Sequence, residues 1–261
     1  RAASGDGPGL PAMSGNGDGR RLADLPWTSW GTAMLAAYGL KLHYSRASVE
    51  DLSWILVPTA QAVGWLRGEA LTLSPSAGWV APDGSYYIAP ACAGVNFMIL
   101  VLTVSVLGFA HRMRSPGERL AWWLAALSGA YVLTIVVNTA RILAAVELYR
   151  TGSVFGLTAE QAHRLLGIVL YLGALWGVFL LLDRLTRRDH APATLAAALL
   201  VPGAYLGMTL LVPLLNGSFR HPGEQSVEHV VVVSGVTMAA LALFLLARRL
   251  PMRAQKRKED G

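Results

Sequence analysis

The chain has 261 residues, of which 54% are hydrophobic and only 15% are charged. Soluble domains usually have about a quarter of their residues charged, so this composition excludes an ordinary soluble globular protein. The formal net charge is +6, but the basic residues gather between apolar stretches, which argues against a nucleic-acid-binding protein. The strand-like alternation that a membrane β-barrel needs is missing. The composition therefore predicts an all-α, polytopic transmembrane helix bundle whose surroundings are the lipid bilayer.

Residues 1–25 are rich in glycine and polar residues and lack apolar periodicity, which predicts disorder. Met13 lies within this segment and is a candidate for the first residue of the natural chain. Residues 26–249 are expected to form one membrane-embedded domain, followed by a basic cytoplasmic tail over residues 250–261.

About seven apolar stretches of the chain are expected to span the membrane, with one more or one fewer as the alternatives at the N-terminal end. A long connection separates the second stretch from the third, and its Pro82-Asp83-Gly84 turn between apolar and aromatic arms predicts a short hairpin on the outer face. The expected spans cover residues 27–42, 52–66, 93–110, 120–138, 163–182, 194–215 and 227–247.

Basic residues at the ends of the spans predict the orientation. If the segment from Arg112 to Arg119 is cytoplasmic, the third span begins outside near Cys92 and the later basic clusters also face inward. One part disagrees, because seven spans would place Arg20 and Arg21 outside. The expected location is a bacterial cytoplasmic (inner) membrane, with the chemistry facing the periplasm or the cell exterior.

Cys92 is the one cysteine of the chain, so an intramolecular disulfide is excluded. It follows Pro90, a residue favoured in the first turn of a helix, and a thiol there would feel the positive end of the helix dipole. This position indicates a nucleophile. The alternative is a small buried side chain without a chemical role.

Three further polar residues, two at the end of the fourth span and one near the start of the third, are expected near the same outer boundary of the membrane. Arg141, three residues after Asn138, could hold a thiolate or an oxyanion, or else extend toward lipid phosphate. Asn96, one turn past Cys92, could donate to an oxyanion or bridge two helices. The supporting residues expected around the site are thus Asn96 and Asn138.

His163 is a candidate general base at the start of the fifth span. Thr158 and Gln161 have the spacing of a capping box, which predicts that the helix begins just before this histidine. A helix N-terminus favours the neutral imidazole that a base requires. His221 and His229 lie on the same side of the predicted topology and remain alternatives.

Other signatures of membrane enzymes are missing from the sequence. It has no H-E-x-x-H zinc motif, no G-x-S-x-G elbow and no paired carboxylates within the spans, and the remaining acid–base pair is Glu228 with His229. No cofactor and no metal are expected.

Three segments resemble the motifs of the exosortase/archaeosortase family: PACAGVNF around Cys92, NTARI around Arg141, and HRLLGIVLY beginning at His163. The stretches GLKLHYSRAS at 39–48 and WILVPTA at 54–60 look most like the exosortase K branch. The resemblance covers about residues 30–245. One departure is Ala93, where the commoner exosortases have serine.

The resemblance implies a cysteine protease or transpeptidase with Cys92 as nucleophile, His163 as general acid/base and Arg141 as the residue that stabilises the thiolate or oxyanion. The implied substrate is an exported protein whose membrane-anchored C-terminal tail, Pro-Glu-Pro-like in typical members, is removed through a thioester. The sequence does not name the acceptor. The alternatives are acyl or lipid transfer by the same thioester chemistry, and a non-enzymatic transporter or scaffold component of a polysaccharide export system.

Overall fold

The computed structural model describes residues 26–152, 156–187, 195–211 and 230–246. Their secondary structure is mostly helical, with one small sheet. The predictions for residues 1–25 and 250–261, and those for His221, Glu228 and His229, fall outside the described residues.

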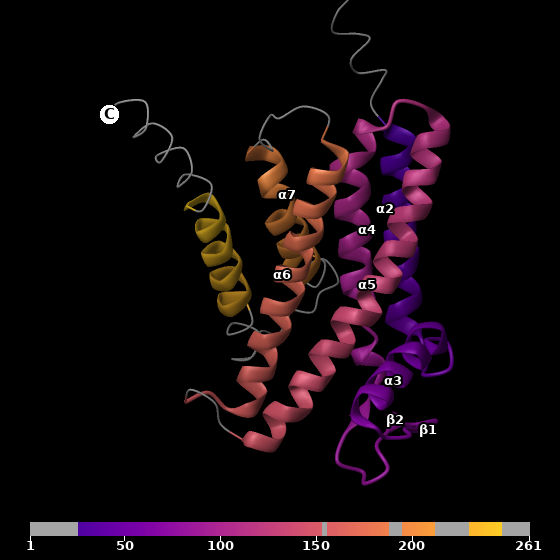
Figure 1. The fold of residues 1–261 in the computed structure, drawn as a ribbon, viewed down its shortest axis with the longest axis vertical. Helices are drawn as coiled ribbons and strands as arrows, with labels where there is room; N and C mark the ends of the chain where they lie inside the picture. The colour runs from indigo at the N-terminus through magenta and orange to yellow at the C-terminus, as the bar shows by residue number, and fades with distance from the viewer. Residues whose placement is uncertain (1–25, 153–155, 188–194, 212–229, 247–261) are drawn as a thin grey trace, which may run out of the picture.

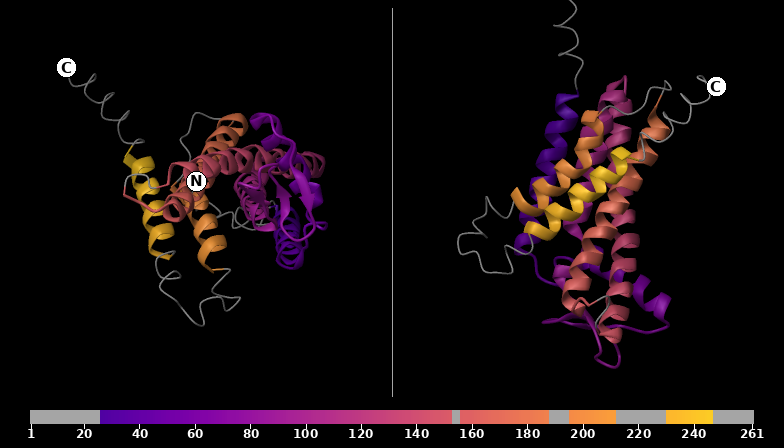
Figure 2. Two further views of the ribbon diagram at one scale, coloured as in Figure 1. Left: turned by 90° about the horizontal axis from the view of Figure 1, so that it is seen from below. Right: turned by 90° about the vertical axis from the view of Figure 1, so that its left-hand side faces the viewer.

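Six helices of the described residues pack together, and the last two of them in chain order are inclined to the other four (Figures 1 and 2). Three segments are long and apolar enough to cross a membrane: Pro90–Arg112, Pro116–Thr151 and Ala159–Thr186. The mostly helical class is therefore confirmed, whereas a bundle of seven spans is not. The bundle helices are α2 (Trp27–Arg46), α4 (Val95–Phe109), α5 (Pro116–Thr151), α6 (Ala159–Thr186), α7 (Leu195–Leu206, followed by the π-turn Gly207–Leu211) and the helix Val230–Leu246.

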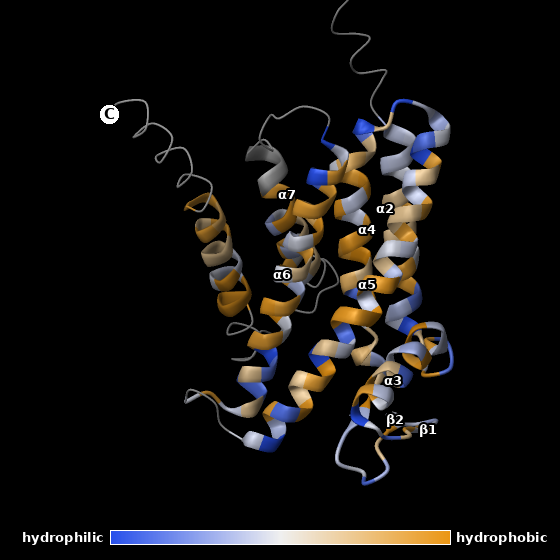
Figure 3. Ribbon diagram, viewed as in Figure 1, coloured by the Kyte–Doolittle hydropathy of each residue, from blue (hydrophilic) through white to orange (hydrophobic). Residues whose placement is uncertain are grey.

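α4 is the central helix of the bundle. In the segment Pro90–Arg112, which contains α4, 72% of the most apolar stretch is buried inside the protein. The corresponding share is 17% for α5 and 22% for α6. The outer helices instead expose large apolar side chains such as Val136, Val169 and Leu181. Figure 3 shows that apolar residues continue along these helices. A helix that is apolar on its outer surface suits lipid rather than water as its surroundings.

The first residues of α5 and of α6 both follow local capping rules. Ser115 caps α5 by accepting a hydrogen bond from the Glu118 amide. At the start of α6 the side chain of Thr158 accepts from the Gln161 amide while the Gln161 side chain accepts from the Thr158 amide. The predicted capping box is thus confirmed, and α6 begins four residues before His163.

A short helix and a three-stranded antiparallel sheet cover one end of the bundle, and we call this unit the cap (Figure 1). The predicted hairpin is confirmed: Trp79 pairs with Ile88 and Val80 with Tyr87, and Gly84 takes a left-handed φ of 69° in the turn between them. The cap consists of α3 (Ser53–Arg67), β1 (Thr72–Ser74), β2 (Gly78–Val80) and β3 (Tyr87–Ile88).

The position of α3 corrects the second predicted span. Its 15 residues extend about 22 Å, short of a hydrocarbon core of about 30 Å. It lies with the sheet at the end where α2 finishes and α4 starts (Figure 1). Apolar residues made the segment look like a span, but they pack it against the bundle: Ile55, Leu56 and Val63 are fully buried.

Without α3 as a span, the start of α2 lies at the same end as the basic turn between α4 and α5. Ser29 and Thr32 of α2 line one cavity with Arg119 and Trp123 of α5. Counting α3 as a crossing had placed these two segments on opposite sides of the membrane.

At this same end a buried carboxylate ties α4 to α6. The Asp183 side chain, only 2% exposed, accepts from Arg112 at 2.8 Å and also pairs with Arg187. Arg112 further donates to the Thr186 hydroxyl at 2.7 Å, and its guanidinium lies 4.9 Å from the Phe109 ring centroid. Predicted basic clusters from two distant segments thus meet at one carboxylate.

Candidate functional site

Cys92 lies in a short turn that precedes α4. Pro90–Cys92 form one 3₁₀ turn, in which the Cys92 amide donates to the Ala89 carbonyl at 2.8 Å. Gly94 is the N-cap of α4, which begins only at Val95. The expectation that Cys92 occupies the first turn of the α-helix is therefore wrong. The helix dipole argument loses its basis, because Gly94 breaks the helical path between the thiol and α4.

Gly94 lets this turn approach α5 closely. Its φ of 74° is in the left-handed region, which side chains rarely adopt. A Cβ at this position would lie 3.0 Å from Cγ2 of Thr134 and 3.1 Å from Cγ of Asn138. Both the conformation and the contact therefore require glycine two residues after Cys92.

Asn138 joins the turn to the rest of the site. It is fully buried on α5, and its Nδ2 donates a hydrogen bond to the Cys92 carbonyl. Its Oδ1 accepts from the Tyr171 hydroxyl at 2.9 Å and from Nη1 of Arg141 at 3.4 Å. One amide thus connects the backbone of Cys92 on one side with Arg141 and Tyr171 on the other.

Arg141, one turn after Asn138, reaches toward α6. Its Nη2 lies 3.3 Å from Nε2 of His163, and its Nη1 donates to the Tyr171 hydroxyl at 3.4 Å. The guanidinium carbon is 5.5 Å from the centroid of the Tyr171 ring. A Cβ at Gly167 would lie 3.3 Å from Nε of Arg141, so the missing side chain gives the guanidinium its space.

His163 is neutral in this arrangement. A guanidinium only donates hydrogen bonds, so Nε2 accepts from Arg141 and the proton of the ring resides on Nδ1. Nδ1 is buried and has no hydrogen-bond partner among the described residues. The ring also lies 5.8 Å from that of Tyr149, near the end of α5.

Asn96 faces away from this group, contrary to one of the roles expected for it. It is exposed, and its Oδ1 accepts from Lys41 of α2 at 3.0 Å. Gly94 resets the start of α4, so counting one helical turn from Cys92 does not give the face on which Asn96 lies. The alternative expectation for Asn96, a bridge between two helices, describes its position.

The structure brings Arg141, His163 and Asn138 together and attaches the Cys92 backbone to them. The Cys92 thiol is half-buried and makes no hydrogen bond to Arg141 or His163 within the described ranges. Tyr171 was part of a quoted motif but was not expected in the site. Its spacing gave a signal, because residues 163, 167 and 171 repeat every four positions and share one face of α6.

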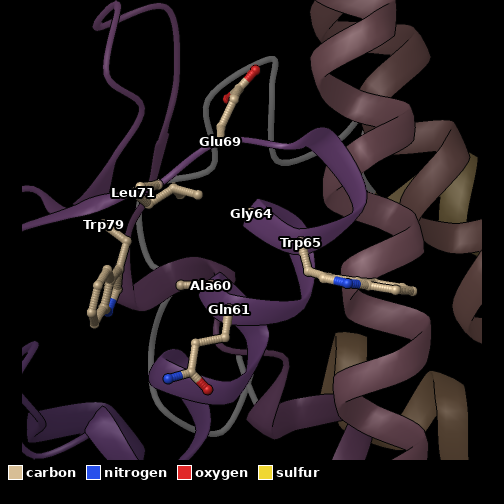
Figure 4. A pocket seen from close by; sticks show the side chains of 8 residues that line it. Ala60, Gln61, Gly64, Trp65, Glu69, Leu71 and Trp79 are labelled. Atoms are coloured by element: carbon tan, nitrogen blue, oxygen red, sulfur yellow. The ribbon is translucent and has the colours of Figure 1, made fainter.

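Two further cavities, besides the one between α2 and α5, lie away from this group. One, of about 220 Å³, opens in the cap between α3 and the strands, where Trp79 lines one side and Trp65 points away from it (Figure 4). A second, of about 230 Å³, lies between α4, α5 and α6 and is lined by small or apolar residues such as Ser105, Gly129 and Leu133. Among the residues that the structure describes, no three His, Cys, Asp or Glu side chains form a metal-binding group.

Comparisons with known proteins add no relative. No family model, no curated protein and no solved structure matches the chain. The functional argument therefore depends on the residues themselves.

Proposed function

We propose that the protein is a membrane-embedded cysteine protease or transpeptidase that removes a C-terminal membrane tail from exported proteins. Cys92 is the nucleophile, His163 the general acid/base and Arg141 the residue that stabilises negative charge. The exosortase-like motifs in the sequence agree with this assignment, which remains a resemblance.

One observation carries the proposal: a single hydrogen-bonded group contains the two chemical partners and the backbone of the thiol. Arg141 contacts Nε2 of His163, and Asn138 contacts both Arg141 and the Cys92 carbonyl. These residues come from α5, α6 and the turn before α4, which are far apart in the sequence. A thiol, an imidazole and a fixed cation are the parts that acyl transfer through cysteine requires.

The chemistry proceeds in two steps. The Cys92 sulfur, after giving its proton to His163, bonds to the peptide carbonyl carbon, and Arg141 donates to the oxyanion that forms. The C–N bond then breaks, His163 returns the proton to the leaving amine, and a thioester remains. Water or an amine acceptor attacks the thioester, its proton passes through His163, and the thiolate leaves.

Substrate binding has to change one contact. Nε2 of His163 accepts from Arg141 in the free protein, so its lone pair is occupied. An oxyanion attracts a guanidinium more strongly than a neutral nitrogen does. When the substrate binds, Arg141 turns toward the peptide carbonyl oxygen, where the oxyanion later forms, and this frees Nε2 to accept the proton of Cys92. Catalytic hydrogen bonds commonly form only in the complex.

The proposed membrane arrangement has six crossings, with the cap on the outer face and the Arg112–Asp183 end in the cytoplasm. The basic turn between α4 and α5 supports this direction through the positive-inside rule. The tail of the substrate would then cross the bilayer beside the bundle and present its outer end near Cys92.

The test measures the removal of C-terminal tails from secreted proteins by mass spectrometry in cells that carry either the wild-type gene or a variant. We expect Cys92→Ala and His163→Ala to abolish processing while the proteins still insert into the membrane at normal levels. The matched control is His111→Ala, because this exposed histidine lies in the turn after α4, at the opposite end of the bundle. Undiminished processing by Cys92→Ala would refute the proposal.

A further inference from the structure

Tyr171 contacts three elements of the site, although the proposed reaction gives it no proton or acyl group to transfer. Its hydroxyl donates to Oδ1 of Asn138 at 2.9 Å and accepts from Nη1 of Arg141 at 3.4 Å. Its ring stacks on Phe97 of α4, with centroids 4.7 Å apart and planes inclined by 16°. The side chain is thus fixed between α4, α5 and α6.

These contacts determine which way the Asn138 amide faces. Oδ1 accepts from Tyr171 of α6 and from Arg141 of α5 itself, so Nδ2 has to point toward the turn, where it donates to the Cys92 carbonyl. A buried amide satisfied on both ends is costly to rotate, because rotation would leave donors facing donors. The turn before α4 is therefore attached to α6 through two side chains.

We propose that Tyr171 and Asn138 are positioning residues, which hold the Cys92 turn at a fixed distance from Arg141 and His163. Neither group exchanges a proton with the substrate. The inference deepens the proposed function and rests on it for the consequence in catalysis, but the attachment itself can be tested without any substrate.

The experiment measures the rate at which iodoacetamide alkylates Cys92 in the purified full chain. At pH 10 a cysteine thiol is normally ionised, so differences in rate report how freely the turn exposes the sulfur. We expect Tyr171→Phe and Asn138→Asp to increase the rate about fivefold, which corresponds to the loss of one net hydrogen bond. Tyr171→Phe keeps the ring on Phe97, and Asn138→Asp keeps an acceptor but removes the donor to Cys92.

Tyr131→Phe is the matched control. Its hydroxyl also makes a hydrogen bond between elements, but it donates to the Trp54 carbonyl of α3 at 2.7 Å and to no residue of the site. We expect this variant to lower the melting temperature by an amount similar to Tyr171→Phe and to leave the alkylation rate unchanged. A role in general stability alone would move both variants in the same way.

Processing of secreted tails by the same variants separates the two proposals. Faster alkylation together with processing reduced to about a tenth supports both of them. Faster alkylation in a protein whose wild type processes no tails leaves the attachment intact and refutes the protease. Unchanged alkylation in Tyr171→Phe and Asn138→Asp, with wild-type processing present, overturns the positioning role alone.

Discussion

The two ends of the bundle both place an arginine between helices, but they treat its charge differently. Arg112 meets the buried carboxylate of Asp183, which also pairs with Arg187. Arg141 contacts only neutral groups among the described residues: the Asn138 amide, the Tyr171 hydroxyl and the His163 imidazole. The first arrangement is complete as a structural ion pair. The second orients a cation without neutralising it, which is what stabilising a transient oxyanion requires.

In this comparison the largest expected effect is the loss of tail processing when Arg141, which contacts no carboxylate among the described residues, is replaced. Arg141→Lys keeps the charge but loses the planar donors that reach Asn138, Tyr171 and His163 at once. We expect tail processing to fall about 100-fold, in the range for loss of an oxyanion donor. The measurement is the processing rate per folded molecule. A variant that processes normally would show that position 141 needs only a positive charge.

A substitution at the opposite end of the bundle should lower the stability of the protein and leave tail processing unchanged. Asp183→Asn leaves Arg112 and Arg187 without a carboxylate, and their partial exposure to solvent limits the cost to about 2 kcal/mol. Thermal unfolding in detergent measures this loss. Processing per folded molecule should match the wild type. If it falls as far as in Arg141→Lys, the two ends are not functionally distinct.

The smallest expected effect is on the local stability of the cap, where a third arginine pairs with a carboxylate. Arg67 donates to Oε1 of Glu69 through two nitrogens, and Tyr86 donates to Oε2 at 2.9 Å. These hydrogen bonds lower the pKa of the Glu69 carboxyl below its usual 4.5, and burial raises the pKa of Tyr86 to about 12. The stabilisation is fully present above about pH 4.5 and is lost as the pH falls through the lowered pKa.

Hydrogen exchange of cap amides should therefore accelerate slightly below that pH in the wild type. Glu69→Gln should have weaker protection at neutral pH and lack the acid-induced change. Because both side chains are partly accessible to water, solvent screens the pair and the effect stays small. An equal acid response in Glu69→Gln would assign the titration to another carboxylate, such as Asp83, whose pKa is also lowered by hydrogen bonds from Ser85.

Local sequence rules predicted the local structure well. The Thr158–Gln161 capping box and the Pro82-Asp83-Gly84 hairpin depend on contacts within a few residues, and both are present. Apolar composition alone could not separate a span from a helix buried at the end of a bundle, and for this reason α3 was misassigned. α5 continues to Thr151, well beyond the predicted end at residue 138, because Arg141, Glu147 and Arg150 end the apolar stretch without ending the helix.

The site was predictable in its residue types and only partly in its geometry. Arg141 contacts both His163 and Asn138, three residues that the sequence analysis had singled out. The left-handed Gly94 changes the path of the chain, which placed Cys92 before the helix and turned Asn96 toward Lys41. A positive φ depends on packing against Thr134 and Asn138, distant residues that no local pattern reveals.

The length of α5 determines how deep the unpaired charge lies. Arg141 is 21 residues after Leu120, and at 1.5 Å per residue this separation is about 32 Å, close to the thickness of the hydrocarbon layer. A cation at mid-membrane without a counter-ion would cost several kcal/mol, whereas the headgroup layer hydrates it at little cost. In the proposed mechanism the same hydration would bring water to the thioester, so a helix somewhat longer than the bilayer thickness would serve both the charge of Arg141 and the second reaction step.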